Sequence, residues 1–264
     1  MNFTNKVVWI TGASSGIGKA LAIELSNLEA KLILSARNNE KLIEVKNFCN
    51  NSASIQILPL DLENHASLNI KAKEAIKLFG RIDVLINNGG ISQRSLASET
   101  TLVVDKRIMD INYLGTVALS KAVLPHFIKN NSGQFVVTTS IVGKIGTPLR
   151  SSYAASKHAL HGFFDSLRAE NHTYNISVTL VCPGFVHTNV SINALTGNGS
   201  PQNTMDNATK NGIPTKRFAL KMAKAIYKKK EEVYIAGAKE KLGVYVKRYY
   251  PKLLSKMIRK LSVT

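Results

Sequence analysis

The sequence of 264 residues has no apolar run that approaches the about 20 residues needed to cross a bilayer as a helix. Its first residues, "MNFTNKVVWITG", enter an apolar strand-like segment almost at once, which leaves no room for a signal peptide. We therefore expect a cytoplasmic protein, or one that contacts a membrane only peripherally. No low-complexity tract divides the chain, so we expect one domain spanning residues 1–264.

Cysteine is scarce. Cys49 lies in a helix-like stretch and Cys182 in an apolar strand-like run, and neither has a second cysteine at the spacing of a metal or redox motif. We expect both to be buried bystanders in a reducing compartment, and we predict no metal site.

Acidic residues are also few, because 17 Asp and Glu stand against 35 Lys and Arg and give a net charge of +18. The excess is greatest from Lys216 onward, where only Glu231, Glu232 and Glu240 oppose some fifteen basic residues. Such a bias suits nucleic acid, anionic lipid, an acidic protein partner or solubility alone. Nucleic acid is the least favoured partner, because the basic tail lacks a recognisable nucleic-acid-binding module.

Short apolar runs alternate with segments of helical periodicity along most of the chain. The runs, in chain order, are "KVVWITG", "KLILSA", "SIQILPLD", "IDVLINN", "GQFVVTTS" and "ISVTLVCPG". This alternation predicts an α/β protein, a single-domain Rossmann fold whose doubly wound parallel sheet has helices on both faces. Ligands of such sheets bind outside the carboxyl ends of the strands.

The first strand is followed by "TGASSGIG", residues 11–18, where the chain turns into a helix. Small residues at this place let backbone amides approach a phosphate at the helix N-terminus. The motif therefore favours a dinucleotide site over an ordinary tight turn. The residues of this candidate site are Gly12, Ser14, Ser15, Gly16, Ile17 and Gly18.

The end of the second strand indicates which dinucleotide binds. An acid there would accept hydrogen bonds from the ribose of NAD, but the sequence reads Ser35, Ala36, Arg37. Arg37, helped by the Ser14 hydroxyl, has the charge to pair with a 2′-phosphate, and the alternative is an exposed loop arginine. The sequence favours NADP (NADPH) over NAD.

Two later strand ends offer further cofactor contacts. Asp61 and Leu62 follow the third strand and would meet the adenine, although Asp61 also suits a turn or a helix cap. The glycine-rich "NNGG", residues 87–90, ends the fourth strand where a flat cofactor can approach the backbone, although an ordinary turn also fits.

Tyr153 and Lys157 lie four residues apart in "SSYAASKHALHGFFDSL", a spacing that puts both on one helical face. The spacing is common by chance. An ammonium near a phenol, however, lowers the phenol pKa from about 10, which would make Tyr153 a proton donor near neutral pH.

Taken together, these motifs resemble the short-chain dehydrogenase/reductase family over roughly residues 6 to 190. TGASSGIG, NNGG, Asn112, Ser140, the Tyr153 and Lys157 pair and "PGFVHT" occur in family order and at family spacing. Gly89 departs from the family pattern, which usually has alanine there, and we expect only a looser turn.

The resemblance implies a role for each matched position. Tyr153 would be the catalytic acid or base, and Lys157 would lower its pKa and hold the nicotinamide ribose. Ser140 would bond the substrate oxygen, and Asn112 would hold a water that connects Lys157 to solvent. Beyond the glycine motif, the resemblance assigns Asn88 and Gly90 to the adenosine side of the cofactor. It assigns Thr188 and the main chain of Val186 to the carboxamide.

"NNGGISQRSL" and "NYLGTVALSKAVLPHFI" look like the dehydrogenase/reductase member 7 branch, whose members are linked to carbonyl, steroid and retinoid reduction. This implies an NADPH-dependent carbonyl reductase for a small, lipophilic substrate. Two alternatives stay open. One is a 3-ketoacyl thioester reductase whose basic surface docks an acidic carrier protein. The other is a non-catalytic cofactor-sensing regulator, which the complete set of Asn112, Ser140, Tyr153 and Lys157 disfavours.

Three further segments are interpreted from their composition and position. Residues 191–214 are polar, offer few apolar anchors and stand where the family has its mobile substrate lid. Gln93 and Arg94 fit an exposed loop pair better than a pocket border. Residues 239–264 form a basic amphipathic segment in which Pro251 starts a second helix. This segment suits packing on the domain, a subunit interface or peripheral contact with an anionic membrane.

The resemblance also implies a homo-dimer or homo-tetramer, formed through the long helices that contain Asn112 and Tyr153. Ala159, Phe163 and Leu167 recur at four-residue spacing and suit either that interface or the core of the domain.

Overall fold

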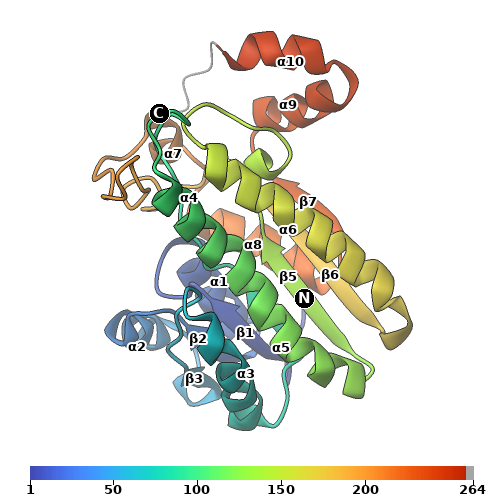
Figure 1. Cartoon of the computed structure of the whole chain (residues 1–264). Helices are drawn as coiled ribbons and strands as arrows, with labels where there is room; N and C mark the ends of the chain where they lie inside the picture. The colour runs from blue at the N-terminus through green and yellow to red at the C-terminus, as the bar shows by residue number, and fades with distance from the viewer. Residues whose placement is uncertain (260–264) are drawn as a thin grey trace.

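The sheet confirms the predicted fold class. In the computed structural model, which describes residues 1–259, seven strands form one parallel sheet in the order β3-β2-β1-β4-β5-β6-β7 (Figure 1). The order reverses between β1 and β4, as in a doubly wound Rossmann fold. The strands are β1 (Val7–Thr11), β2 (Lys31–Ser35), β3 (Ile55–Ile57), β4 (Val84–Asn87), β5 (Gly133–Thr138), β6 (Ile176–Pro183) and β7 (Glu232–Ile235).

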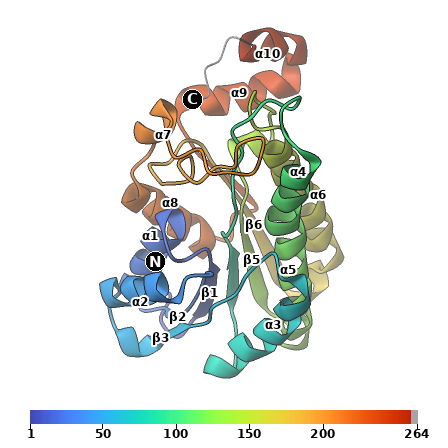
Figure 2. The same cartoon turned by 60° about the vertical axis from the view of Figure 1, so that its left-hand side comes forward.

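Helices cover both faces of the sheet (Figure 2). One face carries α1 (Gly16–Asn27), α2 (Asn39–Phe48) and α8 (Thr215–Tyr227). The other carries α3 (His65–Phe79), α5 (Gly115–Lys129) and α6 (Ser151–Glu170). Strand side chains alternate between these layers, so Val8 and Ile10 join the core under α1 and α8, whereas Val7 and Trp9 join the core under α3, α5 and α6.

The helix that contains Asn112 is not regular. The sequence pattern predicts one continuous helix, but the structure has α4 (Leu102–Met109), a π-helical turn (Asp110–Leu114) and then α5. A hydrophobic pattern of helical period cannot reveal one extra residue in a turn. π-Helical turns inside α-helices are frequent at functional sites.

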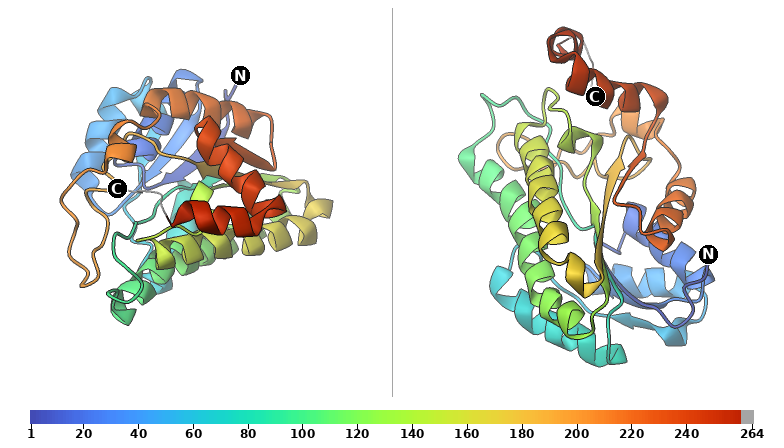
Figure 3. Two further views of the ribbon diagram at one scale, coloured as in Figure 1. Left: turned by 90° about the horizontal axis from the view of Figure 1, so that it is seen from above. Right: turned by 90° about the vertical axis from the view of Figure 1, so that its right-hand side faces the viewer.

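The chain ends in two helices, α9 (Ala238–Tyr249) and α10 (Pro251–Ile258), and the predicted helix start at Pro251 is confirmed. Seen from above, they lie across the carboxyl end of the sheet (Figure 3). A short helix, α7 (Asn207–Lys210), lies within residues 191–214. No helix within residues 1–259 is long and apolar enough to cross a membrane. The predicted tail segment 239–264 extends into residues 260–264, which lie outside the described part.

Candidate active site

The loop Thr11–Gly18, called the glycine loop below, joins β1 to α1 and is tightly folded. Gly12 and Gly16 have φ values of +64° and +53°, which glycine adopts without strain. A Cβ atom on Gly18 would lie 2.2 Å from the carbonyl oxygen of Gly12, so only glycine fits there. Ser15 begins α1 without capping it through its side chain. The helix N-terminus therefore offers backbone amides to an anion.

Asn88 and Thr11 fix this loop. The Nδ2 atom of Asn88 donates to the carbonyl oxygens of Thr11 (3.1 Å) and Gly12 (3.3 Å), and Thr11 Oγ1 accepts from the backbone amides of Asn88 (3.0 Å) and Gly89 (3.1 Å). The side chain of Asn88, which the resemblance assigns to the adenosine side, therefore acts on the glycine loop. A Cβ on Gly89 would lie 2.7 Å from Leu62 Cδ1. Glycine at this position, where the family usually has alanine, therefore leaves room for the buried side chain of Leu62.

The other predicted cofactor residues lie around the same edge. Arg37 is exposed just beyond β2, whose last residue, Ser35, accepts a hydrogen bond from Ala13 of the glycine loop at 3.1 Å. Asp61 accepts a hydrogen bond from the backbone amide of Glu63 at 3.0 Å, as a turn aspartate does. These contacts bring the end of β2, two residues before Arg37, to the glycine loop and give Asp61 a local structural role.

Val186 and Thr188 follow β6. Val186 is buried, and a Cβ on Gly16 would lie 3.2 Å from Thr188 Cγ2, so the loop after β6 reaches the start of α1. A cavity of about 450 Å³ opens there between α1, the loop after β6 and the start of α8. Its lining includes Gly16 and Thr188 but no predicted catalytic residue, so we assign it no catalytic role.

The four predicted catalytic residues approach one another from three parts of the chain. Tyr153 and Lys157 lie on α6, Ser140 directly follows β5, and Asn112 lies in the π-helical turn. The hydroxyls of Ser140 and Tyr153 share a hydrogen bond. Lys157 Nζ donates to the carbonyl oxygen of Thr138 at 2.9 Å. These contacts connect the Tyr153 helix to the end of β5.

Asn112 lies beside Lys157, with Gly90 between them. A Cβ on Gly90 would lie 2.9 Å from Asn112 Oδ1 and 3.6 Å from Lys157 Nζ. Both polar atoms of the Asn112 side chain are hydrogen-bonded: its Oδ1 accepts from Ile91 N at 2.8 Å, and its Nδ2 donates to Ile91 O at 2.9 Å and Ser156 Oγ at 3.1 Å. In this structure, Asn112 positions the strand end that separates it from Lys157. Its predicted water-holding role stays a prediction.

The pKa of Tyr153 differs in direction from the sequence prediction. Burial raises it, and a hydrogen bond from Ser140 and the positive charges of Arg150 and Arg94 act in the opposite direction. Lys157 Nζ lies over the Tyr153 ring, 5.8 Å from its centre, and is not among the charges that shift the pKa of the phenol. Burial also lowers the pKa of Lys157 to about 8. The cations that lower the pKa of Tyr153 are therefore the two arginines.

Arg94 and Gln93, expected to form an exposed loop pair, are both buried, so that expectation is wrong. Gln93 Oε1 accepts from the backbone amides of Ser152 (2.9 Å) and Tyr153 (3.3 Å) at the start of α6. Gln93 thus satisfies amides that the first turn of a helix leaves without partners and fixes the start of α6. Gln93 and Arg94 directly follow "NNGGIS", at the end of the fourth strand. That position was the sequence signal that could have placed them at the site.

Arg94 also holds the predicted lid, residues 191–214. Its Nε donates to Asp206 Oδ2 at 2.9 Å, its Nη2 bonds the same oxygen, and Arg150 Nη2 lies 3.6 Å from it. Ala194 and Leu195 are buried, and Leu195 bonds to the backbone of Ser92 and Arg94. The segment therefore has more anchors than its polar composition suggested.

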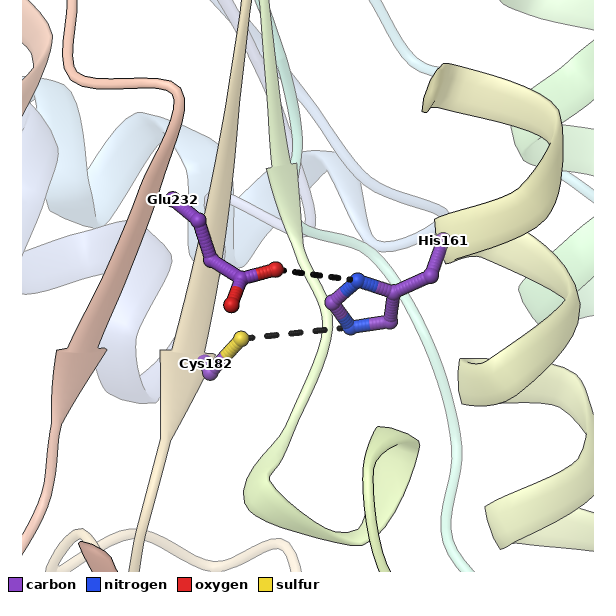
Figure 4. A group of neighbouring side chains, drawn as sticks. All are labelled: His161, Cys182 and Glu232. Carbon is purple, nitrogen blue, oxygen red and sulfur yellow. Dashed lines mark hydrogen bonds and ion pairs between the residues drawn. The ribbon is translucent and has the colours of Figure 1, made fainter. Parts of the chain in front are cut away.

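A cluster missed by sequence reasoning lies between α6 and the strands β6 and β7 (Figure 4). His161 Nε2 lies 3.9 Å from Cys182 Sγ, and His161 Nδ1 lies 3.5 Å from Glu232 Oε2. The carboxylate also pairs with Lys144 at 2.7 Å and accepts from the Tyr234 hydroxyl. Burial raises the pKa of the Cys182 thiol to about 12.

These three ligand-type side chains lie within 4.8 Å of one another. The two ring nitrogens of His161 face different partners, and Glu232 is already paired with Lys144. The cluster therefore joins α6, β6 and β7 as a polar network. Cys182 belongs to this network and is not a bystander, whereas Cys49 is half-buried in α2's C-terminal cap.

Comparisons with known proteins agree with this architecture. The family model described as short chain dehydrogenase matches residues 6–199. The chain belongs to the short-chain dehydrogenase/reductase family and is an oxidoreductase of that family.

Among its relatives, dehydrogenase/reductase SDR family member 7B of Xenopus laevis is 43% identical over 254 residues, which are 94% of this chain and 79% of the relative. Member 7 of Homo sapiens is 42% identical over 254 residues, 94% of this chain and 75% of the relative. The predicted resemblance to the member 7 branch is thus confirmed. A crystal structure of a short chain dehydrogenase/reductase from Burkholderia phymatum in complex with NAD has the same fold, with a TM-score of 0.82 at 22% identity over 96% of each chain.

Proposed function

We propose that the protein is an NADP(H)-dependent oxidoreductase that interconverts a ketone or aldehyde with the corresponding alcohol. The observation that supports this most is the convergence of Ser140, Tyr153 and Lys157 at the carboxyl end of the sheet, next to the glycine loop. A hydroxyl pair able to bond one oxygen atom beside a dinucleotide-type loop is what carbonyl reduction requires.

The glycine loop fits a dinucleotide, because its glycines let the backbone fold tightly at the start of α1, where backbone amides can meet a phosphate. Gly12 to Gly18 and the N-terminus of α1 would hold the pyrophosphate, and Arg37 would pair with a 2′-phosphate. Val186 and Thr188 would hold the carboxamide side. When bound, the nicotinamide supplies or accepts the hydride.

The chain's own residues would protonate the carbonyl oxygen of the substrate and polarise its carbonyl group. Because the pKa of Tyr153 is raised, its hydroxyl is protonated at neutral pH and can give its proton to a carbonyl oxygen. Ser140 bonds the same oxygen, and Arg150 and Arg94 stabilise the phenolate that remains. Lys157, with a pKa of about 8, exchanges protons readily near neutral pH and would hold the ribose.

A homo-oligomer and a cytoplasmic location complete the proposal. Leu102, Val103 and Leu114 are exposed on the side of the molecule formed by α4 and the π-helical turn, which supports an interface there. Leu167, in contrast, is buried in the core of its own chain. Light scattering of the purified protein distinguishes a dimer or tetramer from a monomer.

A substrate panel tests the reaction. Purified protein is given NADPH or NADH with aliphatic, aromatic and steroid ketones, aldehydes, and 3-ketoacyl thioesters, and absorbance of the reduced cofactor is followed. Turnover of free carbonyls with NADPH supports the proposal. Turnover confined to carrier-bound 3-ketoacyl thioesters would favour the acyl reductase. NADPH binding without turnover of any carbonyl would favour the regulator.

A further inference from the structure

The two C-terminal helices, α9 and α10, are fixed to the domain by their inner side. Leu254 is buried, and Val244, Val246 and Ile258 pack with it against a cluster that includes Ile141, Ile145 and Cys182. Glu240 Oε1 accepts a hydrogen bond from the backbone amide of Phe185 at 2.8 Å. The hairpin therefore has a defined orientation next to the loop that follows β6.

The outer side of the same hairpin is apolar and aromatic. Leu242, Tyr245 and Tyr249 follow one another at three- and four-residue spacing on α9 and are 59%, 58% and 71% exposed. Leu253 and Met257 lie one turn apart on α10 and are 51% and 48% exposed. Large apolar side chains grouped in this way mark a binding surface, whereas single exposed ones need no explanation.

Exposed cations lie on the same two helices. From Lys241 to Arg259, the exposed basic residues of the hairpin are Lys241, Lys247, Arg248, Lys252, Lys256 and Arg259. No acidic residue follows Glu240 in the sequence. On α10, Leu254 and Ile258 face the domain while Lys252 and Lys256 stand on the exposed part of the helix. We call these six cations, with Leu242, Tyr245, Tyr249, Leu253 and Met257, the hairpin surface.

The charge of the hairpin surface narrows the choice of partner. If two copies of the chain associated through this face, the six cations of one copy would lie against the six cations of the other. Repulsion between these like charges disfavours such self-association. Nucleic acid would satisfy the cations but would leave the aliphatic side chains of Leu242, Leu253 and Met257 in water. The boundary of an anionic bilayer offers negative headgroups and an apolar layer to the same segment.

We propose that the hairpin surface binds anionic lipid bilayers reversibly and so holds the carboxyl end of the sheet near the membrane. Leu242, Tyr245, Tyr249, Leu253 and Met257 enter the headgroup boundary, and the six cations contact lipid phosphates and carboxylates. The proposal concerns binding and stands whether or not the proposed reaction is correct. If both hold, lipophilic carbonyl compounds reach the site from the bilayer.

Vesicle co-sedimentation tests the proposal with the full chain. Vesicles contain phosphatidylcholine alone or phosphatidylcholine with phosphatidylserine, at low and high salt. Three variants are compared with the unchanged protein: a hairpin cation variant (Lys241→Gln, Lys252→Gln, Lys256→Gln), a hairpin apolar variant (Leu253→Ser, Met257→Ser), and a control that removes three exposed lysines elsewhere (Lys221→Gln, Lys224→Gln, Lys228→Gln). Thermal unfolding of each variant verifies that it is folded.

We expect the unchanged protein to sediment with phosphatidylserine vesicles at low salt and to be released at high salt. The hairpin cation variant binds about 100-fold more weakly, because each Lys adds about 1 kcal/mol toward anionic lipid and 1.4 kcal/mol is tenfold. The folded apolar variant binds the vesicles at least about tenfold more weakly than the unchanged protein, and the control binds them more tightly than the cation variant.

Three results would overturn the proposal. The first is that the unchanged protein stays in the supernatant with phosphatidylserine vesicles at low salt. The second is equal weakening in the cation variant and the control, which would mean non-specific attraction by net charge. The third is tighter binding to a single-stranded RNA oligonucleotide than to these vesicles, lost in the cation variant, which would assign the surface to nucleic acid.

Discussion

Arg94 and Asp206 lie 112 residues apart in the chain, yet Nε of Arg94 donates to Oδ2 of Asp206 at 2.9 Å, with both side chains buried. This pair connects the segment after β4 to the predicted lid. Gln202 Nε2 adds a hydrogen bond to the other oxygen of Asp206 at 3.0 Å. Burial raises the pKa of Tyr153, and Arg94 and Arg150, whose charges oppose that rise, thus share a carboxylate of the predicted lid.

Asp206→Asn is expected to destabilise the protein by about 3 to 5 kcal/mol, because it leaves two buried guanidinium groups without their shared carboxylate. Urea unfolding measures the change. The matched control is Asp165→Asn, which removes an exposed partner of Arg168 on α6 and is expected to cost less than about 1 kcal/mol. Equal effects of the two substitutions would contradict the structural role of the Arg94 and Asp206 pair.

Glu232 predicts a specific dependence of stability on pH. Burial acts to raise the pKa of its carboxyl, but hydrogen bonds with His161, Lys144 and Tyr234 and the charge of Lys144 lower it to about 2. Because the folded-state pKa is depressed, the unfolded chain takes up the proton first as pH falls. The stabilisation is complete above about pH 4.5 and is lost between about pH 4.5 and pH 2.

Glu232→Gln should therefore lower the free energy of unfolding at pH 7 by up to about 3 kcal/mol and reduce its loss between pH 5 and pH 3. Urea unfolding at several pH values measures both effects. Glu170→Gln, which changes an exposed residue at the end of α6, is the control and should change neither. An unaltered pH dependence in Glu232→Gln would show that the His161, Cys182 and Glu232 network does not stabilise the fold.

Arg37→Ala should weaken NADPH binding at least about tenfold and leave NADH binding little changed. A charge-assisted contact between a guanidinium and a phosphate is worth roughly 1.5 to 3 kcal/mol, and NADH lacks that phosphate. Titration of nucleotide fluorescence gives both dissociation constants. Equal losses for the two nucleotides would show that Arg37 does not bind the 2′-phosphate.

Local sequence was sufficient to predict the strands, the glycine loop and the Tyr153 helix, because periodicity and small-residue motifs act over a few residues. It did not predict contacts between distant segments. Arg94 meets Asp206, Gln93 receives the first amides of α6, and His161 meets Cys182 and Glu232 only after the sheet has formed. No period or spacing along the chain encodes such pairs.

The electrostatics of Tyr153 could not be predicted for the same reason. Four-residue spacing correctly places Lys157 on the same face of α6, but it does not say where the ammonium group points. In the structure, Lys157 Nζ bonds the carbonyl oxygen of Thr138, while Arg94 from the loop after β4 and Arg150 from the start of α6 act on Tyr153. The direction of the pKa shift depends on this tertiary arrangement and on burial.

Tyr153→Phe tests the central claim most directly, because it removes one oxygen atom and keeps the ring. With a carbonyl substrate identified by the panel, steady-state kinetics should show at least about a hundredfold loss in kcat, the usual scale for removing a general acid. NADPH binding, measured by fluorescence titration, should stay unchanged and verify an intact site. Near-normal turnover by the folded, NADPH-binding variant would contradict the assignment of Tyr153 as the proton donor.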